Sequence, residues 1–124
     1  MADAKRILDV GQCGVDGPRI GRFLARQGYT VDRAHTLEEA VALAGQKTYD
    51  LVLVNRIMNL DRSPGMEVIK AVLKAKPQQQ VMLVSDRPEA QAEAVALGAL
   101  RGFGKAMLED AATEELLRGV LCCT

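Results

Sequence analysis

The segment from Tyr49 to Asn55 constrains the fold of this chain more than any other stretch. It reads YDLVLVN, and its centre, residues 51–54, is wholly apolar and contains two β-branched valines. A short apolar run without polar alternation is typical of a strand buried on both faces of a parallel sheet. We therefore expect a central strand that ends at one polar side chain, Asn55.

Other segments of the chain alternate between strand and helix patterns. The further expected strands are 6–10, 29–33, 81–84 and 100–105. Helices are expected from Asp16, as the cap, to a stop at Gly28, then over 36–44, 65–76, 88–97 and 113–121. Thr36 and Glu39 form a capping-box pattern at the start of the second helix. This alternation predicts an α/β fold with a doubly wound, five-stranded parallel sheet.

The ends of the predicted strands indicate where a functional site would lie. In doubly wound sheets, ligands bind at the carboxyl ends of the strands. The residues expected at that edge are Gly11, Gln12, Asn55, Ser85 and Lys105.

Composition narrows the classes of partner. The 124 residues suit one domain, 1–124, and the 16 basic and 16 acidic residues leave no net charge to attract nucleic acid or an anionic membrane. No apolar run approaches the ~20 residues that cross a bilayer. Cys13, Cys122 and Cys123 are an odd number without metal-ligand spacing, so we expect reduced thiols and a cytoplasmic protein.

Several segments, in this order and spacing, resemble the receiver domain of two-component response regulators. They are KRIL at 5–8, GYTV at 28–31, TLEEA at 36–40, YDLVLV at 49–54, GMEV at 65–68, VMLVS at 81–85, and Gly98 and Ala99 with Lys105. The resemblance covers essentially the whole chain. It implies a flavodoxin-like three-layer sandwich with strand order 2-1-3-4-5 and a role in signal transduction through a phosphorelay.

The resemblance also implies a set of site residues, and this chain lacks several of them. In the family, an acidic pair after the first strand and an acceptor Asp after the third hold Mg²⁺, while a Ser or Thr and a Lys bind the phosphoryl oxygens. Ser85 and Lys105 match, but the acidic pair falls on Gly11 and Gln12 and the acceptor on Asn55. Mg²⁺ needs carboxylate charge, and an amide is no nucleophile. We therefore expect a pseudo-receiver that is not an enzyme, binds no Mg²⁺ and accepts no phosphoryl group.

Further departures concern the parts that switch the family between states. The loop from Asn55 to Gly65 is longer than usual, and a glycine, Gly102, stands where the family has its reporting aromatic residue, with Phe103 one place later. Other unusual residues are Asn59, Asp86 and Ala106. These changes together favour a constitutive conformation.

The sequence leaves two possible roles open for each of two side chains. Asn55 either caps its loop or holds one fixed conformation. Lys105 either pairs with Asp86, Asp61 or Asp9, or helps to bind an anion beside Ser85 and Arg56. Asp9 lies inside a buried strand, and we expect it to be a partnered structural acid because an unpaired buried carboxylate is costly. Cys13 is expected to be an inert thiol.

One surface is a candidate for protein binding. Alanines recur along the fourth helix, at positions 90, 92, 94 and 96, and apolar or basic residues follow it: Leu100, Arg101, Met107 and Leu108. Receivers commonly use the fourth helix, fifth strand and fifth helix for dimers or effectors, so we expect a protein partner or a homodimer there. Ordinary helix packing by the alanines is the alternative.

Two rival functions stay open from the sequence. The first is a regulator that is still modified elsewhere, for example at Ser85. The second is a small nucleotide- or anion-binding flavodoxin-like module that uses the glycine-rich loop from Gly11 to Gly17 and Lys105, with Asp32 placed to bind a ribose.

Overall fold

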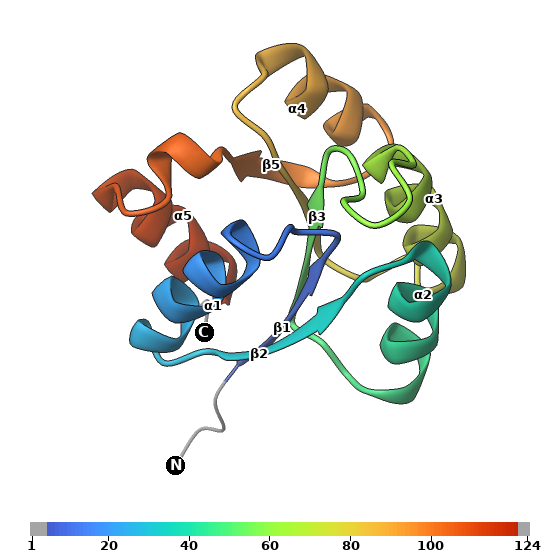
Figure 1. Ribbon diagram of the computed structural model, residues 1–124, viewed down its shortest axis with the longest axis horizontal. Coiled ribbons are helices and arrows are strands. Elements are labelled where there is room, and N and C mark those ends of the chain that lie inside the picture. The colour runs from blue at the N-terminus through green and yellow to red at the C-terminus, as the bar shows by residue number, and fades with distance from the viewer. Residues whose placement is uncertain (1–4, 122–124) are drawn as a thin grey trace.

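A computed structural model describes residues 5–121 and contains a parallel sheet between two layers of helices (Figure 1). The elements are β1 Arg6–Val10, α1 Asp16–Arg26, β2 Thr30–Ala34, α2 Leu37–Gln46, β3 Leu51–Asn55, α3 Gly65–Ala75, β4 Val81–Val84, α4 Pro88–Ala96, β5 Leu100–Phe103, the 3₁₀ helix η1 Lys105–Met107, and α5 Ala111–Leu121.

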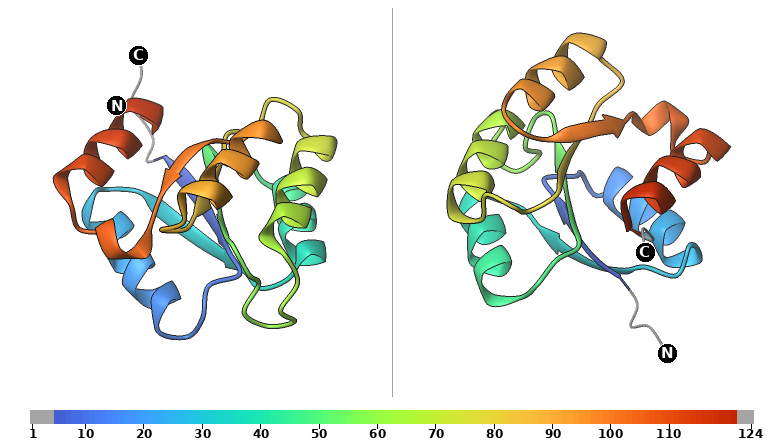
Figure 2. Two further views of the ribbon diagram at one scale, coloured as in Figure 1. Left: turned by 90° about the horizontal axis from the view of Figure 1, so that it is seen from above. Right: turned by 180° about the vertical axis from the view of Figure 1, so that it is seen from behind.

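The sheet has the order β2-β1-β3-β4-β5, and every neighbouring pair is parallel. Helices α1 and α5 cover one face, and α2, α3 and α4 cover the other (Figures 1 and 2). The predicted doubly wound fold, its strand order and the central place of β3 are therefore confirmed.

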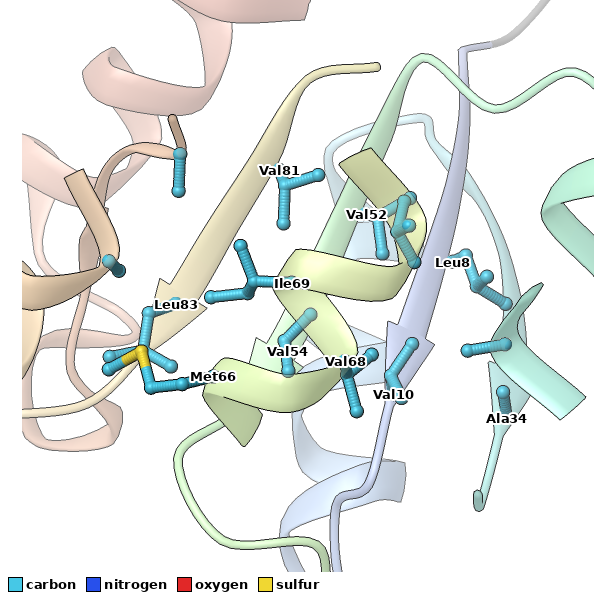
Figure 3. Close-up of a cluster of buried hydrophobic side chains, with 14 of the residues drawn as sticks. Leu8, Val10, Ala34, Val52, Val54, Met66, Val68, Ile69, Val81 and Leu83 are labelled. Atoms are coloured by element: carbon cyan, nitrogen blue, oxygen red, sulfur yellow. The ribbon is translucent and has the colours of Figure 1, made fainter. Parts of the chain in front are cut away.

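Alternate residues of each inner strand enter different cores. Leu8, Val10, Val52 and Val54 face α2, α3 and α4, and Figure 3 shows Met66, Val68 and Ile69 of α3 lying among them. On the other face, the apolar residues of α1 and α5 pack on the remaining strand residues: Ile7, Leu51, Leu53, Met82 and Val84. Burial on both faces explains why residues 51–54 and 81–84 carry no polar side chain.

The observed boundaries correct several predicted ones. Asp16 is the first residue of α1 and does not cap it, since Val15 is the N-cap and makes no side-chain capping bond. Strand β5 ends at Phe103 because Lys105 begins a 3₁₀ helix, and α5 begins at Ala111, before the predicted start. The Thr36 hydroxyl does accept a hydrogen bond from the Glu39 amide, as the capping-box pattern predicts.

Within residues 5–121, no helix is long and apolar enough to cross a membrane. The longest helices have 11 residues. Cys122 and Cys123 lie outside the described residues.

Candidate functional site

A pocket of about 400 Å³ lies at the carboxyl ends of β3, β4 and β5. Three of the predicted site residues, Asn55, Ser85 and Lys105, line it together. The other lining residues are Cys13, Asp16, Arg56, Ile57, Asn59, Arg62, Val84, Asp86 and Arg87. Gly11 and Gln12 are both buried and are not among the lining residues.

The Asn55 side chain is held by two backbone carbonyl groups. Its Nδ2 donates to the oxygen of Gly11 at 3.0 Å and to the oxygen of Ile57 at 2.8 Å. Asn55 therefore ties the end of β3 to the end of β1 and closes the turn that follows it. These two bonds are those of a loop cap, whereas the role in holding one fixed conformation stays a prediction.

Gly11 occupies a place where a larger residue would be strained. Its φ of +81° lies in the left-handed region, and a Cβ built there would overlap Sδ of Met58. Met58 is fully buried, in the lengthened loop between β3 and α3. The Asn59 amide also donates to the Gly11 oxygen at 3.0 Å. The long loop thus fills the space above Gly11 with a thioether.

Lys105 is paired, but with a different acid from those expected. Its Nζ lies 2.8 Å from Oδ2 of Asp16, at the start of α1. The hydrogen bond from Lys105 holds the pKa of the Asp16 carboxyl below its usual value. The predicted pairing with Asp86, Asp61 or Asp9 is therefore wrong, because the first turn of α1 brings Asp16 closer.

Ser85 and Asp86 form a turn that leads into α4. The Ser85 hydroxyl accepts a hydrogen bond from the Arg87 amide at 3.1 Å. The Asp86 carboxylate faces η1, where both of its oxygens lie 3.4 Å from the Ala106 amide. Both side chains thus support the loop, and Ser85 also lines the pocket.

Asp9 and Gln12 are buried beside each other without partners. Asp9 is 1% exposed and Gln12 is 3% exposed, and none of their side-chain oxygen or nitrogen atoms has a hydrogen-bond partner among the described residues. Burial raises the pKa of Asp9 to about 7, against the positive charges of Arg33 and Lys105 and a polar contact with the Gln12 side chain that falls outside hydrogen-bond geometry. The expectation of a partnered acid is therefore wrong.

The glycine-rich loop after β1 does not form an open cradle. The Arg33 guanidinium lies where a side chain at Gly17 would be, and its Nη2 donates to the carbonyl oxygens of Gln12 and Cys13. Asp32, the expected ribose ligand, accepts a hydrogen bond from the Tyr49 hydroxyl at 2.7 Å and pairs with Lys47. A nucleotide module built on this loop is therefore not favoured.

Gln91 fastens α4 to two strands. Its Nε2 donates to the oxygens of Leu83 and Ser85 at 2.9 and 3.1 Å, and its Oε1 accepts from the Gly102 amide at 2.8 Å. A Cβ at Gly102 would overlap the Leu83 oxygen, so β5 approaches β4 too closely there for a side chain. The carboxyl end of β4, the start of α4 and the middle of β5 are thus joined through one buried amide.

The proposed partner face contains both exposed and buried residues. Leu100 is 37% exposed, Met107 is 46% exposed, and Arg101 is also exposed. Leu108 is fully buried, so its expected place on this surface is wrong. Ala90 and Ala94 pack in the core, as the helix-packing alternative predicts, whereas positions 92 and 96 are exposed.

Three arginines also line the pocket, and only Arg56 was considered from the sequence. Arg56, Arg62 and Arg87 have no side-chain ion pair or hydrogen bond among residues 5–121. Nowhere in the described part of the chain do three or more His, Cys, Asp or Glu side chains gather as a metal site would require.

Sequence reasoning also missed Gln91 and Met58. Gln91 lies three residues before Ala94 on the inner face of α4, and a polar residue at a core-facing helix position is a readable signal. Met58 gives no comparable signal, because its position over Gly11 depends on the conformation of the loop.

Comparisons with known proteins agree with this fold. The sequence model of the response regulator receiver domain matches residues 18–116. No curated protein matches the chain. Among solved structures, the signal receiver domain of an HD domain-containing protein from Pseudomonas fluorescens is 21% identical with a TM-score of 0.82, over 98% of this chain and 89% of that one.

Two other solved structures are similar at low identity. A CheY-like response regulator receiver domain protein from Methanospirillum hungatei is 23% identical with a TM-score of 0.78, over 95% of this chain and 94% of that one. A response regulator protein from Burkholderia pseudomallei, solved with a phosphorylated aspartic acid, a calcium ion and citrate, is 23% identical with a TM-score of 0.74. The match covers 94% of this chain and 66% of that one.

Proposed function

The chain belongs to the response regulator receiver domain family, and from this premise we propose that it is a pseudo-receiver that signals without accepting a phosphoryl group. In this proposal it has no enzymatic activity, holds one conformation, and acts in the cytoplasm by binding a protein partner.

The bonding of Asn55 carries the proposal. Asn55 stands where the family resemblance places the acceptor, and its Nδ2 donates to the carbonyl oxygens of Gly11 and Ile57. A carboxamide has no nucleophilic oxygen comparable to a carboxylate, and this one serves as a structural tie. The position thus has a role in the fold that does not involve phosphoryl transfer.

The donors around Asn55 also suit Mg²⁺ poorly. Gly11 offers no side chain, and the thioether of Met58 fills the space beside it. Gln12 is 3% exposed and does not line the pocket. Hard divalent cations prefer charged oxygen ligands, and thioether sulfur is a soft one. The two carboxylates that line the pocket are engaged elsewhere, Asp16 with Lys105 and Asp86 with the Ala106 amide, so these residues do not fit the metal.

A fixed conformation is also supported by the contacts between β4, α4 and β5. The resemblance places the family's reporting aromatic at Gly102, which has no side chain to reorient. The buried amide of Gln91 instead joins Gly102 to Leu83 and Ser85. Breaking this joint would leave buried backbone groups unsatisfied, so the arrangement of β4, α4 and β5 resists change.

The partner is proposed to bind across α4, β5 and α5. Leu100 and Met107 are exposed apolar side chains there, and Arg101 supplies a charge beside them. A groove of about 280 Å³ runs between these elements, next to Gly102 and Met107. Apolar residues around a groove are suited to receive a protein surface.

Incubation with acetyl phosphate and Mg²⁺, followed by intact-protein mass spectrometry, tests phosphoryl acceptance. We expect the wild-type chain to gain no phosphoryl mass, while a receiver that retains its acceptor Asp gains one in parallel. A gain in the wild type would contradict the proposal. A gain that disappears in Ser85→Ala would establish the rival in which the chain is modified at Ser85.

Charge substitutions on the proposed face test partner binding. We expect Leu100→Glu and Met107→Glu to abolish retention of a partner, or self-association in sedimentation, because each puts a charge into an apolar contact. Leu60→Glu is the matched control, since Leu60 is 67% exposed and lies in the loop between β3 and α3. Equal loss in all three variants would refute the assignment of this face.

A further inference from the structure

The pocket at the carboxyl ends of the strands has an excess of positive charge. Lys105 and Asp16 neutralise each other in their ion pair. The remaining charged lining residues are three arginines, Arg56, Arg62 and Arg87, and one carboxylate, Asp86, which leaves two positive charges uncompensated.

The three arginines lack protein partners, although acids lie nearby. Glu89 and Glu93 line an adjoining hollow together with Arg56 and Arg87, yet none of these residues forms an ion pair within 4.0 Å. Guanidinium groups that line one pocket without partners are suited to planar, two-point contacts with phosphate oxygens.

The loop that presents Arg62 is ordered by its own hydrogen bonds. The Arg62 amide donates to the Met58 oxygen at 2.8 Å, and the Met58 amide donates to the Ser63 oxygen at 2.8 Å. Arg62 has a φ of +64°, the only positive φ of a non-glycine residue among the described ones. An arginine held in this conformation is costly, and costly backbone conformations gather at functional sites.

The size of the pocket admits a ligand larger than orthophosphate. Its volume of about 400 Å³ falls within the range of small-molecule sites, about 300–1,000 Å³, and is larger than one orthophosphate needs. Lys105 is already paired with Asp16, and Nδ2 of Asn55 is bound to carbonyl oxygens. The arginines, with the Ser85 hydroxyl beside them, are the groups left to hold a ligand.

We propose that this pocket binds a diffusible small molecule with two or more linked phosphoryl groups, held without covalent bonding by Arg56, Arg62 and Arg87. This inference goes beyond the proposed function, because it involves neither the protein partner nor the loss of phosphoryl acceptance. In this proposal the ligand is held by the three arginines, and not by the glycine-rich loop or Lys105.

Calorimetric titration of the wild-type chain with inorganic pyrophosphate at low ionic strength tests the inference. We expect saturable binding to one site, and binding of orthophosphate that is about tenfold weaker because fewer charged hydrogen bonds form. Arg56→Gln, Arg62→Gln and Arg87→Gln are each expected to weaken pyrophosphate binding about five- to tenfold, and the triple variant to abolish it.

Arg118→Gln is the matched control, because Arg118 is an exposed arginine of α5 that does not line the pocket. We expect it to bind pyrophosphate as the wild type does. Circular dichroism of each variant checks that the fold is retained. Absence of binding to the wild type, or equal binding by the wild type and a folded triple variant, would overturn the inference. Intact mass stays unchanged in either case, so the result is independent of the phosphoryl-acceptance test.

Discussion

Two buried glutamines, one after β1 and one in α4, differ in every polar contact. Gln91 is 5% exposed, and its amide makes three hydrogen bonds to α4's neighbouring strands. Gln12 is 3% exposed, and neither its oxygen nor its nitrogen has a partner among the described residues. The first side chain joins three elements, whereas the second is buried and joins none.

The difference shows how burial can have opposite effects on stability. A buried amide with all its hydrogen bonds fixes the structure around it, whereas an unsatisfied one loses its water without replacement. The two acids near Lys105 repeat the contrast, since Asp16 is paired and Asp9 is not. We therefore expect low local stability at the end of β1. We expect high local stability at the edge formed by β4, α4 and β5.

The largest expected effect is at Asp9. Its pKa is about 7 in the folded protein and near 3.8 when unfolded, so the folded state binds more protons between these values. Stability therefore falls as pH rises from about 4 to about 7, by at most about 4 kcal/mol. Asp9→Asn should remove this fall and be more stable than the wild type at about pH 8.

Urea unfolding of both proteins across this pH range measures the effect. Equal pH slopes for the wild type and Asp9→Asn would mean that Asp9 is satisfied in solution and that the contrast with Asp16 does not hold.

Gln91→Met should destabilise the protein by about 3 kcal/mol, because it leaves the partly buried Gly102 amide and two carbonyl oxygens without partners. Gln78→Met is a matched control at an exposed position and should change the free energy of unfolding little. Hydrogen exchange at the amide of Gly102 should also accelerate. If the Gly102 amide stays protected from exchange, the Gln91 side chain does not hold β4, α4 and β5 together.

The same substitution at Gln12 should act in the opposite direction. Gln12→Met removes two unsatisfied polar atoms and keeps a similar volume, so we expect a gain of about 1 kcal/mol. The measurement belongs near pH 5, where Asp9 is mostly protonated and contributes little to the change. A loss similar to that of Gln91→Met would show that Gln12 has a partner in solution.

The smallest expected effect concerns Asp16. Its pKa is lowered by Lys105, so its contribution is present above the unfolded pKa and disappears as pH falls through the folded one. Because both side chains are about a quarter exposed, at 27% and 28%, Asp16→Asn should cost less than about 1 kcal/mol. The cost should shrink further in high salt, and a salt-independent loss would point to a role other than charge pairing.

The fold was largely predictable because two of the buried strands contain runs without polar side chains. Residues 51–54 and 81–84 carry no polar side chain, and Thr36 with Glu39 marks a helix start by local chemistry. Each of these signals comes from residues close together in the sequence, so it predicts local structure without knowledge of the tertiary contacts.

The site was less predictable because its contacts join residues far apart in the sequence. The pairing of Lys105 with Asp16 depends on where α1 begins, and the isolation of Asp9 depends on which side chains fail to reach it. Positions at strand ends could be predicted, and so Asn55, Ser85 and Lys105 were found together. Their hydrogen-bond partners required the three-dimensional structure.

The thioether above Gly11 limits which sequences are accessible to this chain by single substitutions. Gly11→Asp would bring a side chain against Met58 at a left-handed φ, and Asn55→Asp would place oxygen against the carbonyl oxygens of Gly11 and Ile57. Each substitution alone is therefore expected to lower stability. An acidic site at these positions therefore requires the Met58 side chain and the bonds of Asn55 to rearrange together.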